Sequence, residues 1–274
     1  MAACLFVPTA TGQAVRSRSA DYHFASTVQD VRALWLNPAG LAVRREASIL
    51  GEFALERPVD SEIRLAQWTL AFNSRGFSFG YQRDRFAEHP STGAFRFGVA
   101  VPFRGGAIGG SFSFYRGNAI DTTQTWDRGL DLGLRYRLAG IVDLGLVVRN
   151  ISRPVLRDSV APLVGVLSVA VQPLSPHMWL AAETSATEKL GASGVDMGYR
   201  AGLSISTGGS LPFSLVSSID LGSSFRVNQW VVGLAVGGPY QGLAIGSGGV
   251  RSPRNRLERL SLTGVATTQM GGAP

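Results

Sequence analysis

The side chains that could carry out catalysis in this 274-residue chain are few and widely separated. His23, His89 and His177 are too far apart for a paired metal-ligand motif, and Cys4 is the only cysteine. The glycine-rich run at 105–110 lacks the lysine of a phosphate-binding loop, and no G-x-S-x-G nucleophile motif occurs. The sequence therefore predicts a protein that is not an enzyme and that uses neither a metal nor a cofactor. A serine and a histidine on neighbouring strands are an alternative that sequence spacing does not test.

The composition narrows the class of protein further. The chain holds 34 glycines and only 16% charged residues, which is unsuited to a disordered chain or a helical bundle. The net charge of +7 is almost all arginine, with Lys189 as the one lysine, and the arginines are scattered. Because a nucleic-acid-binding face would cluster them, no nucleic-acid partner is expected. No run of about 20 apolar residues occurs, so no membrane-spanning helix is predicted.

From residue 47 onward the apolar residues alternate with small or polar ones, as they do in β-strands. Phe77 and Phe79, for example, alternate with Ser78 and Gly80. The pattern predicts about fourteen strands, near 47–56, 63–73, 75–83, 94–101, 107–116, 127–138, 141–150, 161–171, 177–185, 195–206, 211–221, 226–236, 239–247 and 257–267. The fold class is thus all-β. A soluble antiparallel barrel or sandwich would show the same alternation, so further features must decide.

The connections between the strands alternate between short and long. Ala139-Gly140 is a short one, whereas 117–126 is long and polar. Short turns at one rim and long loops at the other are typical of an antiparallel up-and-down barrel of the outer membrane. The basic loop residues would then lie near lipid and lipopolysaccharide phosphates. Seven aromatic residues near strand ends would suit the membrane interfaces, with ordinary packing as the alternative for each: Trp68, Tyr115, Trp126, Tyr136, Trp179, Trp230 and Tyr240.

The charged residues of the strands are expected to face a lumen. An arginine facing lipid at mid-bilayer costs about 2–4 kcal/mol, so charges belong on the inner face. The lumen-facing charges predicted in this way are Arg96, Asp131, Arg135, Asp143, Arg149, Asp196, Arg200 and Asp220. We expect the aspartates to form ion pairs with the arginines. By the same alternation Leu132 faces lipid, and a serine should be tolerated in place of the lumen-facing Gly133.

The stretch before the strands has a helical pattern. Thr27-x-x-Asp30 resembles a helix start, and Val31, Leu34 and Trp35 then fall on one helical face. Asn37-Pro38-Ala39-Gly40 should end this helix, because asparagine tolerates the left-handed conformation, proline cannot continue a helix and glycine frees the backbone to reverse. So short a helix is marginal in water and needs a surface to pack against.

The segment Asn37-Pro38-Ala39-Gly40-Leu41, with a helix before it and a barrel pattern after it, resembles the long-chain fatty-acid transporter (FadL) family. It is also similar to the PorV/PorQ-type barrels of a secretion system. The resemblance implies fourteen strands and an N-terminal plug, called the hatch below, folded into the lumen. The hatch residues it implies are Val31, Leu34, Trp35, Asn37, Pro38, Ala39, Gly40 and Leu41. The chain departs from the family in being shorter and in lacking a terminal aromatic residue on its last strand.

The chain is accordingly divided into four parts. Residues 1–14 look like a truncated signal peptide, 15–45 form the hatch, 46–268 form the outer-membrane barrel and 269–274 are a short polar tail. The expected function is passive uptake of hydrophobic, fatty-acid-like small molecules. The alternative is a structural or secretion-associated barrel that docks a secretion or periplasmic protein partner. In either case the expected location is the bacterial outer membrane.

Overall fold

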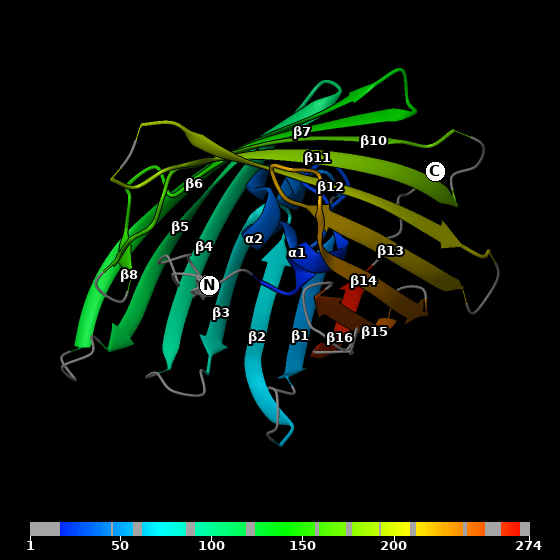
Figure 1. Ribbon diagram of the computed structural model, residues 1–274. Helices are drawn as coiled ribbons and strands as arrows, with labels where there is room; N and C mark the ends of the chain where they lie inside the picture. Colours follow the sequence, from blue (N-terminus) through cyan, green and yellow to red (C-terminus); the bar gives the residue numbers. More distant parts are fainter. Residues whose placement is uncertain are drawn as a thin grey trace.

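Fourteen antiparallel strands close into a single barrel (Figure 1). The computed structural model describes residues 17–44, 46–56, 62–85, 91–118, 124–156, 159–173, 177–191, 193–208, 212–237, 240–249 and 259–268. The barrel strands are β1 (Ala47–Glu56), β2 (Arg64–Ser74), β3 (Phe77–Asp84), β4 (Thr92–Phe103), β5 (Gly106–Asn118), β6 (Gln124–Leu138), β7 (Val142–Arg149), β10 (Val164–Val171), β11 (Met178–Glu188), β12 (Val195–Ser206), β13 (Phe213–Leu221), β14 (Val227–Val236), β15 (Tyr240–Gly249) and β16 (Arg259–Thr268). The predicted all-β, up-and-down architecture is confirmed.

The first strand closes the barrel by pairing with the last one. Ala47 of β1 lies opposite Ser74 of β2 on one side and opposite Thr268 of β16 on the other. Closure gives each of the fourteen barrel strands a partner on both sides, which is the condition that a sheet must meet in lipid, where water cannot satisfy backbone groups. Neighbouring strands follow each other around the wall, apart from the step from β7 to β10.

That step contains two short strands that the sequence pattern did not predict. Strands β8 (Val155–Leu156) and β9 (Ser159–Val160) pair with each other in the long connection between β7 and β10. Each has two residues, too few to show a period. The predicted start of the third strand at residue 75 is also wrong, because Arg75 and Gly76 form a tight turn with positive φ angles of 50° and 93°.

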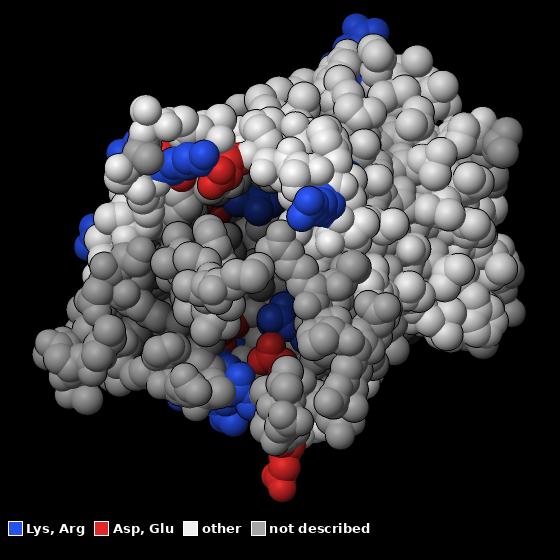
Figure 2. All heavy atoms as spheres, viewed as in Figure 1, with Lys and Arg blue, Asp and Glu red and all other residues white. Residues whose placement is uncertain are grey.

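The apolar face of the wall points outward and the polar face inward. Phe77 and Phe79 are 55% and 38% exposed, whereas Ser78 between them is fully buried. Leu132 is 49% exposed, and its neighbour Asp131 is buried. In Figure 2 the outer wall on the right carries almost no charge, whereas charged side chains gather in a hollow at the middle. This polarity is the reverse of a soluble barrel and is that of a barrel in lipid.

The hatch lies inside the barrel, where its short helices are surrounded by strands (Figure 1). Its elements are α1 (Ser19–Tyr22), α2 (Ala33–Leu36) and the 3-10 helix η1 (Pro38–Ala42), and every residue from 31 to 42 is buried. Among the described residues, no helix is long and apolar enough to cross a membrane. Burial on all sides means that the hatch depends on the barrel wall for its structure.

The predicted helix ends at Asn37 as expected, but it begins later than Thr27, because only Ala33–Leu36 is α-helical. The side chain of Thr27 bonds Phe24, and the carboxylate of Asp30 accepts a hydrogen bond from Arg32 N at 2.9 Å. Asn37 is extended, with φ −151°, rather than left-handed, and it both ends α2 and caps η1. Polar groups of the wall satisfy the hatch backbone, so a long helix is not needed for that purpose.

Candidate functional site

The candidate site is the hatch together with the inner wall that holds it. The 3-10 helix η1 lies directly on glycines of the wall. A Cβ added at Gly109 would come within 2.6 Å of the carbonyl of Pro38, and one at Gly133 within 2.1 Å of Asn37 Oδ1. Side chains of the hatch meet glycines in the same way, with Leu34 against Gly98. Serine at Gly133 would therefore collide with Asn37 and Pro38 and should displace the hatch, whereas its tolerance in barrel assembly stays a prediction.

The motif residue Asn37 ties the parts of the hatch together and to the wall. Its Nδ2 donates hydrogen bonds to Ala25 O at 2.8 Å and to Leu134 O of β6 at 3.1 Å. Its Oδ1 accepts a hydrogen bond from Ala39 N at 3.2 Å. Gly40 is required for packing rather than for a reversal of the chain, because a Cβ there would lie 2.5 Å from Val28 O.

The apolar hatch residues fill the lumen. Val31 and Leu34 are fully buried, and Trp35 is 5% exposed with its ring against Gly80 of β3. The remaining predicted hatch residues, Pro38, Ala39, Gly40 and Leu41, are buried as well. Burial of a large apolar side chain is worth roughly 1.5–3 kcal/mol, which offsets the entropy lost in ordering so short a segment.

Three lumen arginines donate hydrogen bonds to carbonyl groups of the hatch, a role that the sequence did not reveal. Arg135 Nη1 donates to Val28 O at 2.8 Å, and Arg149 Nη2 donates to Leu36 O at 2.8 Å. Arg200 donates to two carbonyls, Ala20 O and His23 O. A short irregular segment exposes backbone carbonyls, and arginine, with five N–H donors, can bond several of them at once. The predicted inward orientation of these arginines thus places them against the hatch.

The lumen carboxylates pair with arginines of the inner face, Arg135 among them. Arg96 lies 3.0 Å from Asp131, and Arg135 lies 3.1 Å from Asp143. A second partner of Asp143 is Arg137, at 2.6 Å. These pairs join neighbouring or next-but-one strands on the inner face.

Arg200 has an additional partner that was not predicted, and Asp196 departs from the predicted pairing. Arg200 has Asp220 at 3.9 Å, but the carboxylate of Glu183 is nearer, at 3.2 Å. Glu183 was not predicted, although the alternation along β11 would have placed it inward. Asp196 was expected to pair with a lumen arginine; instead it is 68% exposed and lies 3.1 Å from Lys189. It lies at the start of β12, where the strand extends past the packed part of the lumen.

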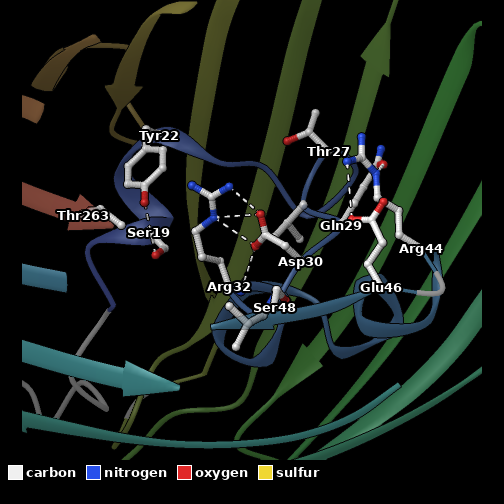
Figure 3. A network of polar contacts seen from close by, with 12 residues as sticks. Ser19, Tyr22, Thr27, Gln29, Asp30, Arg32, Arg44, Glu46, Ser48 and Thr263 are labelled. Atoms are coloured by element: carbon white, nitrogen blue, oxygen red, sulfur yellow. Dashed lines mark hydrogen bonds and ion pairs between the residues drawn. The ribbon is translucent and has the colours of Figure 1, made fainter. Parts of the chain in front are cut away.

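A further polar network lies within the hatch itself (Figure 3). The carboxylate of Asp30 faces the guanidinium of Arg32, with Arg32 Nε donating at 2.9 Å. Burial alone would raise the pKa of the Asp30 carboxyl, but the Arg32 charge outweighs it and lowers that pKa to about 2. Tyr22 and Ser19 donate to Glu52 of β1, at 3.5 Å and 3.0 Å. The hatch therefore has an ion pair of its own, between Asp30 and Arg32, and hydrogen bonds to a carboxylate of the wall, Glu52.

Two of the aromatic residues assigned to the membrane interface face the lumen instead. Tyr115 is 7% exposed and accepts a hydrogen bond from Arg96 at 3.1 Å. Trp179 packs edge-on against Phe24 of the hatch, with ring centroids 5.7 Å apart. Trp126 is 57% exposed on the outside, as expected. Aromatic type and position near a strand end do not distinguish the two faces.

A cavity of about 500 Å³ lies between the hatch and the wall. Its hatch side is formed by Ala20, Ala25, Trp35 and Leu36. Its wall side includes apolar residues of β10 and the Arg96–Asp131 and Arg200–Glu183 pairs. Arg149, at the end of β7, and Asn150 and Pro162, in the long connection from β7 to β10, also line the cavity, so the cavity lies toward the rim that carries this connection.

Among the described residues no group of three or more possible metal ligands exists. His23 lies in the hatch, whereas His177 lies next to the first residue of β11, so the two histidines belong to different parts of the fold. Cys4, His89, the predicted signal segment 1–14 and the tail 269–274 lie outside the described residues.

Comparisons with known proteins give the fold. No family model matches the chain, and no curated protein matches it. The solved structure described as the CymD monoaromatic hydrocarbon channel aligns with a TM-score of 0.57 and 10% identity, covering 89% of this chain and 94% of that chain. Salmonella typhi OmpF, in complex with daunomycin, aligns at 0.44 with 8% identity, covering 81% of this chain and 96% of that chain. Acinetobacter baumannii Omp33 aligns at 0.44 with 10% identity, covering 82% of this chain and 98% of that chain.

The chain is an outer-membrane β-barrel. The closed antiparallel wall, its apolar exterior and its likeness to the CymD structure agree on this fold. The location in the bacterial outer membrane and the membrane-lipid surroundings follow from it.

Proposed function

We propose that this barrel is a passive transporter that takes up hydrophobic small molecules across the outer membrane. The observation that carries the proposal is the cavity of about 500 Å³ whose inner side is formed by the hatch. A solute in this cavity contacts Trp35 and Leu36 directly, so it can advance only by displacing the hatch or passing beside it. The hatch contains only short helices and depends on the wall, which makes it the part of the fold most easily displaced.

Two further observations support uptake. The Asn37–Leu41 segment, through which the sequence resembles the fatty-acid transporter family, lies directly against the wall glycines Gly109 and Gly133. The CymD structure, described as a hydrocarbon channel, shares the barrel fold. The Asn37–Leu41 segment gives the hatch a fixed closed position, as uptake without an open pore requires.

The test combines conductance with uptake. We expect the intact protein to conduct poorly in planar bilayers and to speed the entry of radiolabelled octanol or octanoate into cells that lack other hydrophobic transporters. Deletion of residues 29–37 should leave a barrel that still migrates as a folded species in unheated gels, and should raise its conductance. Equal conductance of the two proteins, together with uptake no faster than in cells without the barrel, would refute the proposal.

A second candidate function is a structural or secretion-associated barrel that docks a protein partner. What favours it is the number of polar bonds that hold the hatch, from Arg135, Arg149, Arg200 and the side chain of Ser218, which donates to Asp21 O at 2.8 Å. A permanently closed barrel would have such bonds. It would show no uptake and would retain a periplasmic protein through purification.

A further inference from the structure

The charges around the cavity are balanced. Among the described residues that line it, three are arginines and three are carboxylates: Arg96, Arg149, Arg200, Asp131, Glu183 and Asp220. Their formal charges therefore sum to zero. A site built for an anion would be expected to hold an excess of positive charge, since an uncompensated charge in a poorly solvated space is costly.

The arginines are also engaged by groups of the protein. Arg96 binds Asp131 at 3.0 Å and Tyr115 Oη at 3.1 Å. Arg200 binds Glu183 at 3.2 Å, donates to two hatch carbonyls, and its guanidinium lies 4.1 Å from the centre of the Phe24 ring. A ligand carboxylate would have to compete with these carboxylates for the same donors.

The uncharged part of the lining is mixed, with polar groups from Ser185, Thr187, Asn228 and Gln229 and apolar groups from both the hatch and the wall. Trp35 and Leu36 of the hatch and Val164 and Val166 of β10 present hydrocarbon to the cavity. A pure hydrocarbon would cover the ion pairs without bonding to them, and would lose their hydration. A neutral group that both donates and accepts can instead bond a carboxylate oxygen and a guanidinium N–H while both pairs stay intact.

From this balance we propose that the cavity binds neutral amphiphiles, namely alcohols, phenols or amides with an apolar body, in preference to fatty acids and other carboxylates. The inference rests on the proposed uptake function and names its substrate class. Such a ligand directs its apolar body toward Trp35 and Val166 and its polar end toward Arg96 and Asp131. The volume of about 500 Å³ suits a small molecule.

The experiment compares 1-octanol with octanoate at pH 8, using Trp35 fluorescence of the full chain and Trp35→Phe as the blank. We expect octanol to bind about tenfold more tightly than octanoate, because only the carboxylate must break an existing pair. Asp131→Asn removes one negative charge from the cavity and should shift the preference about tenfold toward octanoate. Asp143→Asn is the matched control: Asp143 pairs with Arg135 and Arg137 but does not line the cavity, so the preference should not change.

A ratio of preferences is measured because both ligands also partition into detergent, and that effect cancels between variants. Asp220→Asn is a second cavity variant in case loss of the Asp131 bond to Asn150 N impairs folding. Tighter octanoate binding in the wild type, or equal shifts in the cavity variants and in Asp143→Asn, would overturn the inference while uptake itself stands. No binding of either ligand together with no uptake would overturn both.

Discussion

Replacing Gly109 by alanine should release the hatch without harming the barrel. The new Cβ would lie 2.6 Å from both the carbonyl carbon and the oxygen of Pro38 and 2.7 Å from Ala39 N. Ordinary contacts begin at 3.4 Å, so η1 must move away from β5 by roughly 0.8 Å. The neighbouring atoms belong to backbone on both sides, so no side chain can rotate to relieve the clash.

The energetic effect follows from the bonds that such a shift would stretch. A hatch movement of roughly 0.8 Å is enough to stretch the bonds that join the hatch to the wall, such as those from Asn37 to Leu134 O and from Arg149 to Leu36 O, beyond useful range. With the bond from Arg135 to Val28 O, three hydrogen bonds are at risk, each worth roughly 0.5–1.5 kcal/mol. A loss of about 2–4 kcal/mol would raise the ratio of displaced to seated hatch roughly 30- to 700-fold.

The neighbouring residue provides the control. Gly110 faces outward, and a Cβ there would meet Leu132 at 3.4 Å, an ordinary contact. Gly109→Ala and Gly110→Ala therefore add the same methyl group to adjacent residues on opposite faces of β5. We expect higher bilayer conductance and stronger iodide quenching of Trp35 in the first variant alone, with both variants running as folded barrels in unheated gels. Equal conductance and quenching in the two variants would show that the glycines do not hold the hatch in place.

Two further predictions concern pH and the lipid face. Burial, with Arg32 and Arg200 nearby and opposed by Asp30, holds the pKa of His23 well below its usual value. In the displaced hatch His23 takes up a proton below pH about 6.5, so the seated form should lose stability as the pH falls through that value. The bilayer conductance should therefore rise between pH 7.5 and 5. An equal rise in the conductance of a His23→Asn variant would contradict this cause. Leu132→Arg should destabilise the assembled barrel by about 2–4 kcal/mol, because Leu132 is 49% exposed on the lipid side. The measurement is the midpoint of urea unfolding in lipid vesicles, which should be lower in the variant. An unchanged midpoint would place residue 132 outside the bilayer.

The strands could be predicted from the sequence because lipid imposes one rule on all of them. A residue facing hydrocarbon must be apolar, so Phe77, Phe79 and Leu132 reveal the outer face with no knowledge of their neighbours. The inner face has no such rule. A charged residue in a strand predicts only that its side chain points inward. Whether Arg200 binds Asp220 or Glu183 depends on the register between β11 and β12.

The hatch was harder to predict because its conformation is fixed by the wall. The apolar spacing of Val31, Leu34 and Trp35 fits a helix, yet only Ala33–Leu36 is α-helical. Val28 O, which a longer helix would have bonded internally, is bonded by Arg135, and Leu36 O, which the end of a helix leaves without a partner, is bonded by Arg149. These bonds join residues 107 and 113 positions apart, a separation at which no local pattern can reveal them.

The position of the hatch at the start of the chain sets the order in which the molecule can be assembled. The hatch leads into β1, and β1 is also the strand that must pair with β16 to complete the wall. Arg200 meets Ala20 across 180 residues, so the hatch cannot acquire its final contacts until most strands have been made. Contacts this distant in sequence form slowly. A hatch still outside when β1 meets β16 would have to enter through a finished rim, so the last strand pairing is the step at which the interior of the protein becomes fixed.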